Sequence, residues 1–362
     1  PGRRASAASY AMVSGGQQQQ QQRPPPSTPL ACGQAVYSLA TMAGAYTGGA
    51  SSAPLVLAAG RDKTIRAYAP DGELCLQHSA HIDRIWSVVA VDSTTVASAS
   101  ADRTVQLWKL RGRRDADDAR GLPLELAKLG TLAGHTESVQ ALMMHQGKLV
   151  SASADCTIRM WDPQSRELLS VCSLPASMRP GEHTAVYALH EAGPDGGTLW
   201  SGHWGGSLNL WDAPSGRLVR SLELVHEGPV HALQPLPHST ELMASAGADG
   251  MVRLWDARSL GRVGELHAGG SAVYAMAATA GGSESMLITA GYDGCLKVWD
   301  VRALRPAPLT NLQAHGDSVR ALLACDGAVW SGSTDGTMRC WDLAHLPLAL
   351  HGARLSPDTF AV

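Results

Sequence analysis

Short stretches that alternate apolar with small or polar residues fill the chain from Leu30 onward. Segments such as AVYSLAT (35–41), LVLAAG (55–60) and RIWSVVA (84–90) are separated by Gly, Asp or Ser. Alternation with a period of two between turn residues is typical of β-strands that bury one face. No segment shows the 3.6-residue period of a long helix. The pattern therefore predicts an all-β protein made of many short strands.

One line of sequence recurs seven times in this part of the chain. It runs from a small residue, Asp and a variable residue into an alternating strand that ends in an aromatic residue. The aromatic residues are 40 to 53 residues apart, a period that fits four strands per unit. Asp follows directly in five cases. The seven residues are Tyr68, Trp108, Trp161, Trp211, Trp255, Trp299 and Trp341.

This repeat resembles that of the WD40 family, and the resemblance covers about residues 31–350. It implies a seven-bladed β-propeller, with four-stranded antiparallel blades around a central channel. We expect the propeller to span residues 30–352. A Gln- and Pro-rich tail (1–29), whose composition cannot bury a core, precedes it, and a short tail (353–362) follows.

The last strand of the ring has two candidate sources. One is LPLALHG (346–352), and the other is the segment before Cys32, which would cross over from the first unit. Proline is a poor strand residue, and the N-terminal stretch is rich in it. We therefore expect the C-terminal segment to close the ring.

Four residue types recur together in the units: His, Ser or Thr, Asp and Trp. In the family, the indole donates to the hydroxyl, the hydroxyl meets the imidazole, and the imidazole meets the turn Asp. Such a satisfied buried network specifies one geometry. The five complete sets are His81, Ser98, Asp102 and Trp108; His135, Ser151, Asp155 and Trp161; His226, Ser245, Asp249 and Trp255; His267, Thr289, Asp293 and Trp299; and His315, Ser331, Asp335 and Trp341.

His, Ser and Asp are also the components of a hydrolase triad. An enzyme needs one such site, whereas this set occurs five times and always with Trp, which indicates a requirement of the fold. The sequence shows no Gly-rich phosphate loop, metal-spaced His cluster or unique nucleophile. We expect a protein that is not an enzyme and that uses no cofactor or metal.

Two units depart from the pattern. The first ends in Tyr68, with Cys32 and Ala58 where the His and the hydroxyl residue would lie. The fourth keeps Ser201 but has Gly205 in place of the turn Asp. We expect these two blades to be the least rigid.

The second unit is lengthened by an insertion between Lys109 and Leu132, in which Arg and Asp alternate. We expect a solvated surface loop, with a docking element for a partner as the alternative.

The remaining aromatic residues are not randomly placed. In propellers of this family, the residue after the first aliphatic residue of the inner strand and the residue before the turn Asp point to the top rim of the channel. Seven units with two such positions each give fourteen rim positions. Six of them hold Trp or Tyr, with arginines in or beside the set. The alternative is that these rings fill the channel wall between blades. We predict that the top face binds an acidic or modified peptide through Tyr37, Arg61, Arg84, Trp86, Tyr187, Trp204, His231, Tyr274, Tyr292 and Arg320.

A second motif suggests another class of function. WDAR (255–258) and WDVR (299–302) look like the motif by which WD-repeat substrate receptors dock onto the adaptor of cullin-based ubiquitin ligases. The contacts would be Arg258 and Arg302. Arginine at this position is also common as an ordinary solvated charge. The leading hypothesis is a non-catalytic scaffold that binds a peptide or partner protein on its top face, and the ligase receptor is the alternative.

Charge and composition limit the partners further. The net charge is −3, so the chain lacks the broad basic surface on which non-specific nucleic-acid binding depends. No apolar stretch approaches the roughly 20 residues that cross a bilayer. Seven cysteines without a CxxC pair favour reduced thiols and an intracellular protein, cytoplasmic or nuclear. The start at Pro1 rather than Met suggests a fragment with room for an upstream domain. The oligomeric state is left open.

Overall fold

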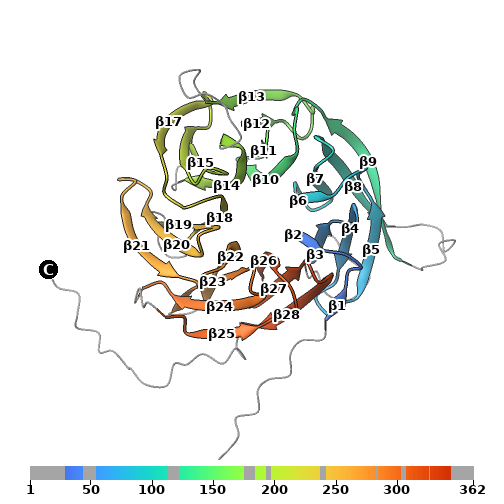
Figure 1. The fold of residues 1–362 in the computed structure, drawn as a ribbon. Coiled ribbons are helices and arrows are strands. Elements are labelled where there is room, and N and C mark those ends of the chain that lie inside the picture. Colours follow the sequence, from blue (N-terminus) through green and yellow to red (C-terminus); the bar gives the residue numbers. More distant parts are fainter. Residues whose placement is uncertain are drawn as a thin grey trace, which may run out of the picture.

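Seven four-stranded sheets surround a common axis in the computed structural model of the chain (Figure 1). The structure describes residues 29–43, 54–112, 122–174, 184–192, 197–236, 242–281, 284–302, 307–325 and 327–343. Every pairing within the sheets is antiparallel, and each sheet forms one blade. The first strand of a blade lines the central channel and the fourth lies at its outer edge. The predicted all-β fold with seven blades is confirmed.

The blades follow one another along the chain. The first three consist of β2 (Val36–Met42), β3 (Leu55–Gly60), β4 (Thr64–Tyr68) and β5 (Leu74–Ser79); β6 (Ile85–Ala90), β7 (Thr95–Ser100), β8 (Val105–Gly112) and β9 (Leu124–Leu132); and β10 (Val139–His145), β11 (Lys148–Ser153), β12 (Thr157–Trp161) and β13 (Leu168–Ser173). The next three consist of β14 (Val186–Ala192), β15 (Thr198–His203), β16 (Leu208–Asp212) and β17 (Arg217–Leu222); β18 (Val230–Pro235), β19 (Leu242–Gly247), β20 (Met251–Asp256) and β21 (Arg262–His267); and β22 (Val273–Gly281), β23 (Glu284–Gly291), β24 (Cys295–Asp300) and β25 (Thr310–Gln313). The seventh consists of β26 (Val319–Cys325), β27 (Ala328–Ser333), β28 (Thr337–Asp342) and β1 (Leu30–Ala31).

The ring is closed by the N-terminal side of the chain, so the expectation of a C-terminal closing strand was wrong. Strand β1 pairs with β28, with Leu30 opposite Met338. The Cys32 amide extends the contact by donating to the Gly336 carbonyl at 2.8 Å. The proline argument failed because Pro29 precedes the pairing residues, where its missing N–H removes no ladder bond. The segment 346–352 lies outside the described residues.

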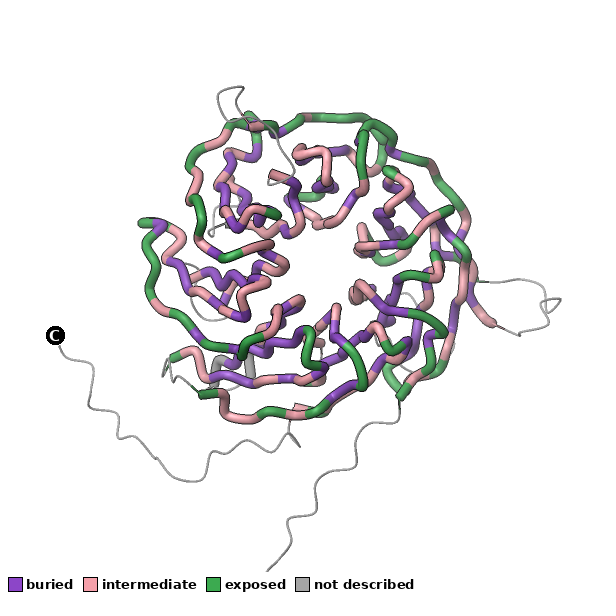
Figure 2. The backbone as a smooth tube through the Cα atoms, in the orientation of Figure 1, coloured by how far each residue is buried: buried purple, intermediate pink, exposed green. Residues whose placement is uncertain are grey.

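The core lies between neighbouring blades rather than at the axis. The second strands β3 and β7 are buried along their whole length, whereas the exposed residues gather on the outer strands (Figure 2). Large side chains such as Trp200, Trp211 and Trp299 are fully buried in the apolar layers between the sheets. Each blade therefore holds its neighbours in a fixed orientation and fixes the two ends of the channel.

The described part of the insertion in the second blade is strand. Strands β8 and β9 continue as a paired ladder out to Gly112 and Leu124. The Arg- and Asp-rich stretch 113–121, for which a surface loop was predicted, lies outside the described residues, as do the tail residues 1–28 and 344–362.

Candidate functional site

Each inner strand carries a β-bulge at its second residue. In the first blade the register shifts between Val36 and Ser38, and the same shift recurs in the other six. A bulge leaves one residue out of the ladder and changes the direction of its side chain. We call the seven displaced residues the belt: Tyr37, Trp86, Gln140, Tyr187, His231, Tyr274 and Arg320.

The belt residues contact one another from blade to blade around the channel. Tyr37 and Trp86 stack with their ring centres 4.8 Å apart. His231 lies between Tyr187 and Tyr274, at 6.3 and 4.9 Å. All belt residues are half-buried, so the belt fills part of the channel wall. This agrees in part with the alternative that the rings pack between blades.

A hydroxyl continues the belt from the second blade into the third. The Trp86 indole donates to Ser138 Oγ at 2.9 Å, and the Gln140 amide donates to the same oxygen at 3.2 Å. Trp86 is thus held by ring stacking on one side and by a hydrogen bond on the other, and its orientation is fixed before any partner arrives.

The turns between second and third strands bring a further set of residues to the same end of the propeller, which we call the top face. In every blade the amide before the turn's Asp position donates to a carbonyl just before the inner strand; for Trp204 and Tyr292 this bond is 2.9 Å long. Trp204 is 41% exposed and contacts Tyr187, with ring centres 5.3 Å apart. Tyr292 is 65% exposed. These are the two aromatic residues classed as exposed in the part of the chain that the structure describes.

Arginines lie over two of the belt rings. The Arg320 guanidinium carbon is 3.6 Å from the centre of the Tyr274 ring, and that of Arg84 is 5.5 Å from the Trp86 ring. The Arg320 Nε is buried and has no hydrogen-bond partner among the described residues. Arg61 is exposed on the first blade, on the same face. All ten residues predicted for the top face therefore lie at one end of the channel.

His231 is uncharged at neutral pH. Burial, followed by the positive charge of Arg320, lowers the pKa of its imidazole to about 4. The belt thus carries the positive charge of Arg320 and no second charge from the neighbouring imidazole.

The His, Ser, Asp and Trp sets lie between the belt and the outer strands in the second, third, fifth and seventh blades. In the third, the Trp161 indole donates to Ser151 Oγ at 2.8 Å, and Ser151 contacts His135 Nε2 at 2.8 Å. His135 Nδ1 contacts the Asp155 carboxylate at 2.8 Å. A carboxylate only accepts, so Nδ1 carries the proton and Nε2 accepts from the serine. The other three blades repeat these contacts.

The sixth blade has no His in this network, so the assignment of His267 was wrong. In the four blades with the complete network the His lies four residues before the first aliphatic residue of the inner strand, and here that position is Gly269. His267 is the last residue of β21 and is exposed. Lys297 instead donates to Asp293 and to the Ala268 carbonyl, while Trp299 donates to Thr289 at 2.9 Å.

The fourth blade compensates for its missing turn Asp in a way that the sequence did not reveal. His203, the last residue of β15, contacts Ser201 Oγ through Nε2 at 2.8 Å and donates from Nδ1 to the Thr184 carbonyl at 2.8 Å. Asn209 also donates to Nε2, at 3.0 Å. The imidazole is fully buried, and burial lowers its pKa to about 4 despite the bond to Thr184.

The first blade replaces the network with a contact between two side chains. The Cys32 thiol and the Tyr68 hydroxyl are 3.2 Å apart, and both side chains are buried beside Ala58. With alanine at the hydroxyl position, these two groups have each other as partners. Burial, the largest cause, raises the pKa of both.

Arg258 and Arg302 lie on the opposite end of the propeller, which we call the bottom face. Each is exposed and occupies the turn after the third strand, in the neighbouring fifth and sixth blades. In both turns the arginine amide donates to the preceding Asp, Asp256 at 2.9 Å and Asp300 at 3.0 Å. The two arginines thus occupy equivalent positions on one face.

No cluster of three or more His, Cys, Asp or Glu suited to a metal ion occurs among the residues that the structure describes. Within the same residues, no helix is both long enough and apolar enough to cross a membrane.

Sequence comparison gives the family. The profile of the WD domain, G-beta repeat, matches residues 72–109, 126–162, 216–256, 261–300 and 306–342, which make up just over half of the chain. The chain belongs to the WD40 repeat family. Each matched WD40 repeat begins with the outer strand of one blade and ends with the third strand of the next. The unmatched stretches hold most of the first and fourth blades, whose networks depart from the WD40 pattern.

The chain is also similar to individual proteins with several different names. Ribosome biogenesis protein YTM1 of Kluyveromyces lactis is 31% identical over 30% of the chain and 24% of its own length. An F-box/WD-40 repeat-containing protein of Arabidopsis thaliana is 24% identical over 56% of the chain and 35% of its length. The ribosome biogenesis protein WDR12 homolog of the same plant is 27% identical over 56% of the chain and 51% of its length. The chain therefore spans at most about half of each of these relatives.

Proposed function

We propose that this WD40 propeller is a non-catalytic scaffold that binds an acidic segment of a partner protein across its top face. The observation that carries the proposal is the guanidinium of Arg320, held 3.6 Å over the Tyr274 ring. A stacked guanidinium keeps its in-plane N–H groups for a carboxylate. Because its own arginines already cover two of the belt rings, the face suits an anionic ligand better than a cationic one.

The top face has two sectors, which favour a ligand with both acidic and apolar side chains. Arg61, Arg84 and Arg320 lie on the first, second and seventh blades, which are neighbours in the ring. The exposed rings of Trp204 and Tyr292 lie on the fourth and sixth blades. A peptide that crosses the channel would place carboxylates on the first sector and apolar side chains on the second. Rigid aromatic anchors beside arginine are a common composition of energetic centres in interfaces.

Affinity purification with the full chain as bait tests this proposal. We expect a Trp86→Ala, Trp204→Ala double variant to recover at least about tenfold less of its specific partners than the wild type. Truncating interface anchors commonly weakens binding by this much. A Val219→Ala, Val263→Ala double variant is the matched control, since it removes exposed apolar side chains from the outer strands β17 and β21. Equal recovery of all partners by both variants would contradict a top-face site.

A second function has one observation in its favour. Arg258 and Arg302 are both exposed at equivalent turns of neighbouring blades, as docking to the adaptor of a ubiquitin ligase would require. One of the relatives is named an F-box/WD-40 repeat-containing protein. In the same purification, an Arg258→Ala, Arg302→Ala variant would then lose cullin-adaptor subunits and keep the partners of the top face. If no such subunits are recovered with the wild type, the receptor function is wrong.

A further inference from the structure

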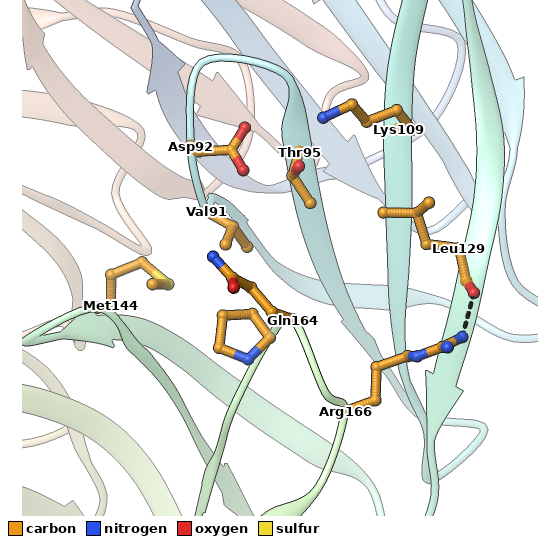
Figure 3. A pocket seen from close by; sticks show the side chains of 10 residues that line it. Val91, Asp92, Thr95, Lys109, Leu129, Met144, Gln164 and Arg166 are labelled. Carbon is orange, nitrogen blue, oxygen red and sulfur yellow. Dashed lines mark hydrogen bonds between the residues drawn. The ribbon is translucent and has the colours of Figure 1, made fainter.

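A cavity of about 540 Å³ opens on the bottom face between the second and third blades. Its lining comes from the turns β6–β7, β10–β11 and β12–β13 and from strands β7, β8, β9 and β10. All three turns are at the end opposite the belt, because strands alternate in direction within a blade. Figure 3 shows Lys109, Leu129 and Arg166 on one side of the cavity and Met144 and Gln164 on the other.

Arg166 is fixed in place by a neighbouring blade. Its Nη1 donates to the Leu129 carbonyl at 2.6 Å, from a turn of the third blade to the outer strand of the second (Figure 3). That carbonyl belongs to a bulge, since Gly130 pairs with Leu107 and Lys128 with Trp108.

Gly130 makes room for the arginine. A Cβ on this residue would lie 2.8 Å from the Arg166 Cδ, which is closer than two such atoms approach. The arginine side chain therefore lies against bare backbone at this position.

Lys109 is held at the same wall by a polar chain. Its Nζ donates to Thr94 Oγ1 at 2.6 Å, and Thr94 donates to the Asp92 carboxylate from both its hydroxyl, at 2.9 Å, and its amide, at 2.7 Å. Burial alone would raise the pKa of Asp92, but the bonds from Thr94 and Thr95 and the nearby Lys109 lower it. Asp92 is the one acidic side chain among the described residues that line the cavity, and its hydrogen-bonding capacity is partly occupied by Thr94.

The cavity thus combines positive charge with apolar surface. None of the ion pairs within the described residues includes Lys109 or Arg166. Beside them lie Val91, Met144 and Pro163, together with Leu129, which is 39% exposed. A ligand that complements this lining has a carboxylate next to an aliphatic group. A hydrated inorganic anion would leave the apolar wall unused.

We propose that this cavity is a second binding site, for an extended acidic segment of a partner protein. An Asp or Glu side chain would lie between Arg166 and Lys109, and an adjacent aliphatic side chain would contact Leu129 and Met144. The volume lies in the range of ligand-binding clefts, about 300–1,000 Å³, and holds two or three peptide side chains rather than a folded domain. This site is on the opposite face from the proposed top-face site, and the two proposals can be tested independently.

Selection of phage-displayed random 12-residue peptides on the full chain tests the site. We expect enriched peptides to include a group with Asp or Glu beside Leu, Ile or Met. Synthetic copies of this group should bind a Lys109→Glu, Arg166→Glu variant at least about tenfold more weakly, because both cationic groups beside the ligand carboxylate become anionic. The Val219→Ala, Val263→Ala variant should bind them like the wild type, and their affinity should fall with added salt.

A second, less disruptive variant separates loss of binding from loss of folding. Gly130→Ala keeps both charges but pushes the Arg166 side chain from its position, and we expect it to weaken the same peptides by about threefold to tenfold. Thermal unfolding of each variant checks that it is folded. If no acidic and aliphatic group is enriched, or if its members bind the charge-reversed and wild-type chains equally, the site is wrong. Peptides that depend only on Trp86 and Trp204 would support the top face and likewise reject this cavity.

Discussion

Lowering the pH from 8 to 5 is expected to reduce the free energy of unfolding by about 2 kcal/mol through His203 alone. The pKa of this buried imidazole is lowered to about 4, against 6.5 for a free histidine. Between these values the unfolded chain binds a proton that the folded chain does not, so stability falls as the pH falls from about 6.5 toward 4. The hydrogen bonds give the reason. Nε2 accepts from both Ser201 and Asn209, and a proton on it would face the Asn209 N–H, a donor that cannot accept it.

Urea unfolding at a series of pH values measures this effect. His203→Gln is the control, because glutamine does not titrate while its amide oxygen still accepts a hydrogen bond. The variant is less stable at pH 8, but its stability should change with pH by about 2 kcal/mol less than that of the wild type. His231, whose pKa is also about 4, adds a separate pH dependence that both proteins share. Parallel stability curves for the two proteins would show that His203 is not the group that titrates.

Replacing Ser151 by alanine is expected to lower the free energy of unfolding by about 2 to 4 kcal/mol, since two buried polar groups lose their partner. Ser151 is fully buried and joins Trp161 Nε1 to His135 Nε2. Thr289→Ala in the sixth blade should have about half this effect, because only the Trp299 indole depends on that hydroxyl. The difference between the two losses therefore measures how much the contact between the hydroxyl and the histidine, which the sixth blade lacks, contributes to the free energy of unfolding.

Urea unfolding at pH 7.5 gives both values, and Ser151→Thr is the matched control. It keeps the hydroxyl, as the sixth blade does naturally, and adds one methyl group, so we expect a loss of about 1 kcal/mol, the low end of the cost of an extra methyl group in a packed interior. An equal loss for Ser151→Ala and Thr289→Ala would mean that the His contact contributes nothing measurable.

The sequence repeat predicted most of the architecture, because the contacts that define a blade lie at fixed, short spacings along the chain. Six Trp residues each lie ten positions after the hydroxyl residue that accepts their indole N–H, so the pairing is visible as a spacing. The inner-strand bulges also occur at a fixed position in each unit. Every belt residue comes directly after the first aliphatic residue of its strand, and this placed the predicted top-face side chains on one end.

The errors arose where a neighbouring residue resembled the expected one. His267 is the predicted histidine of the sixth blade, although counting four residues back from Val273 leads to Gly269. His203 was missed because it enters the network from inside β15, two residues after Ser201, and no spacing rule of the other blades applies to it. The cavity between the second and third blades could not be predicted. It depends on Arg166 reaching a carbonyl 37 positions earlier in the chain, which is a property of packing rather than of pattern.

Ring closure by β1 also sets an order of events during synthesis. Leu30 leaves the ribosome about 300 residues before its partner Met338, so the seventh blade waits for the last strand to be made. Until then the growing chain exposes the unpaired strand β1 and the apolar face of the first blade that the seventh blade will cover. Both are prone to wrong contacts. The pairing of β1 with β28 can form only after Met338 has been made, and contacts this distant in sequence form slowly. Protection from wrong contacts would therefore be needed longest by the first strands of the propeller.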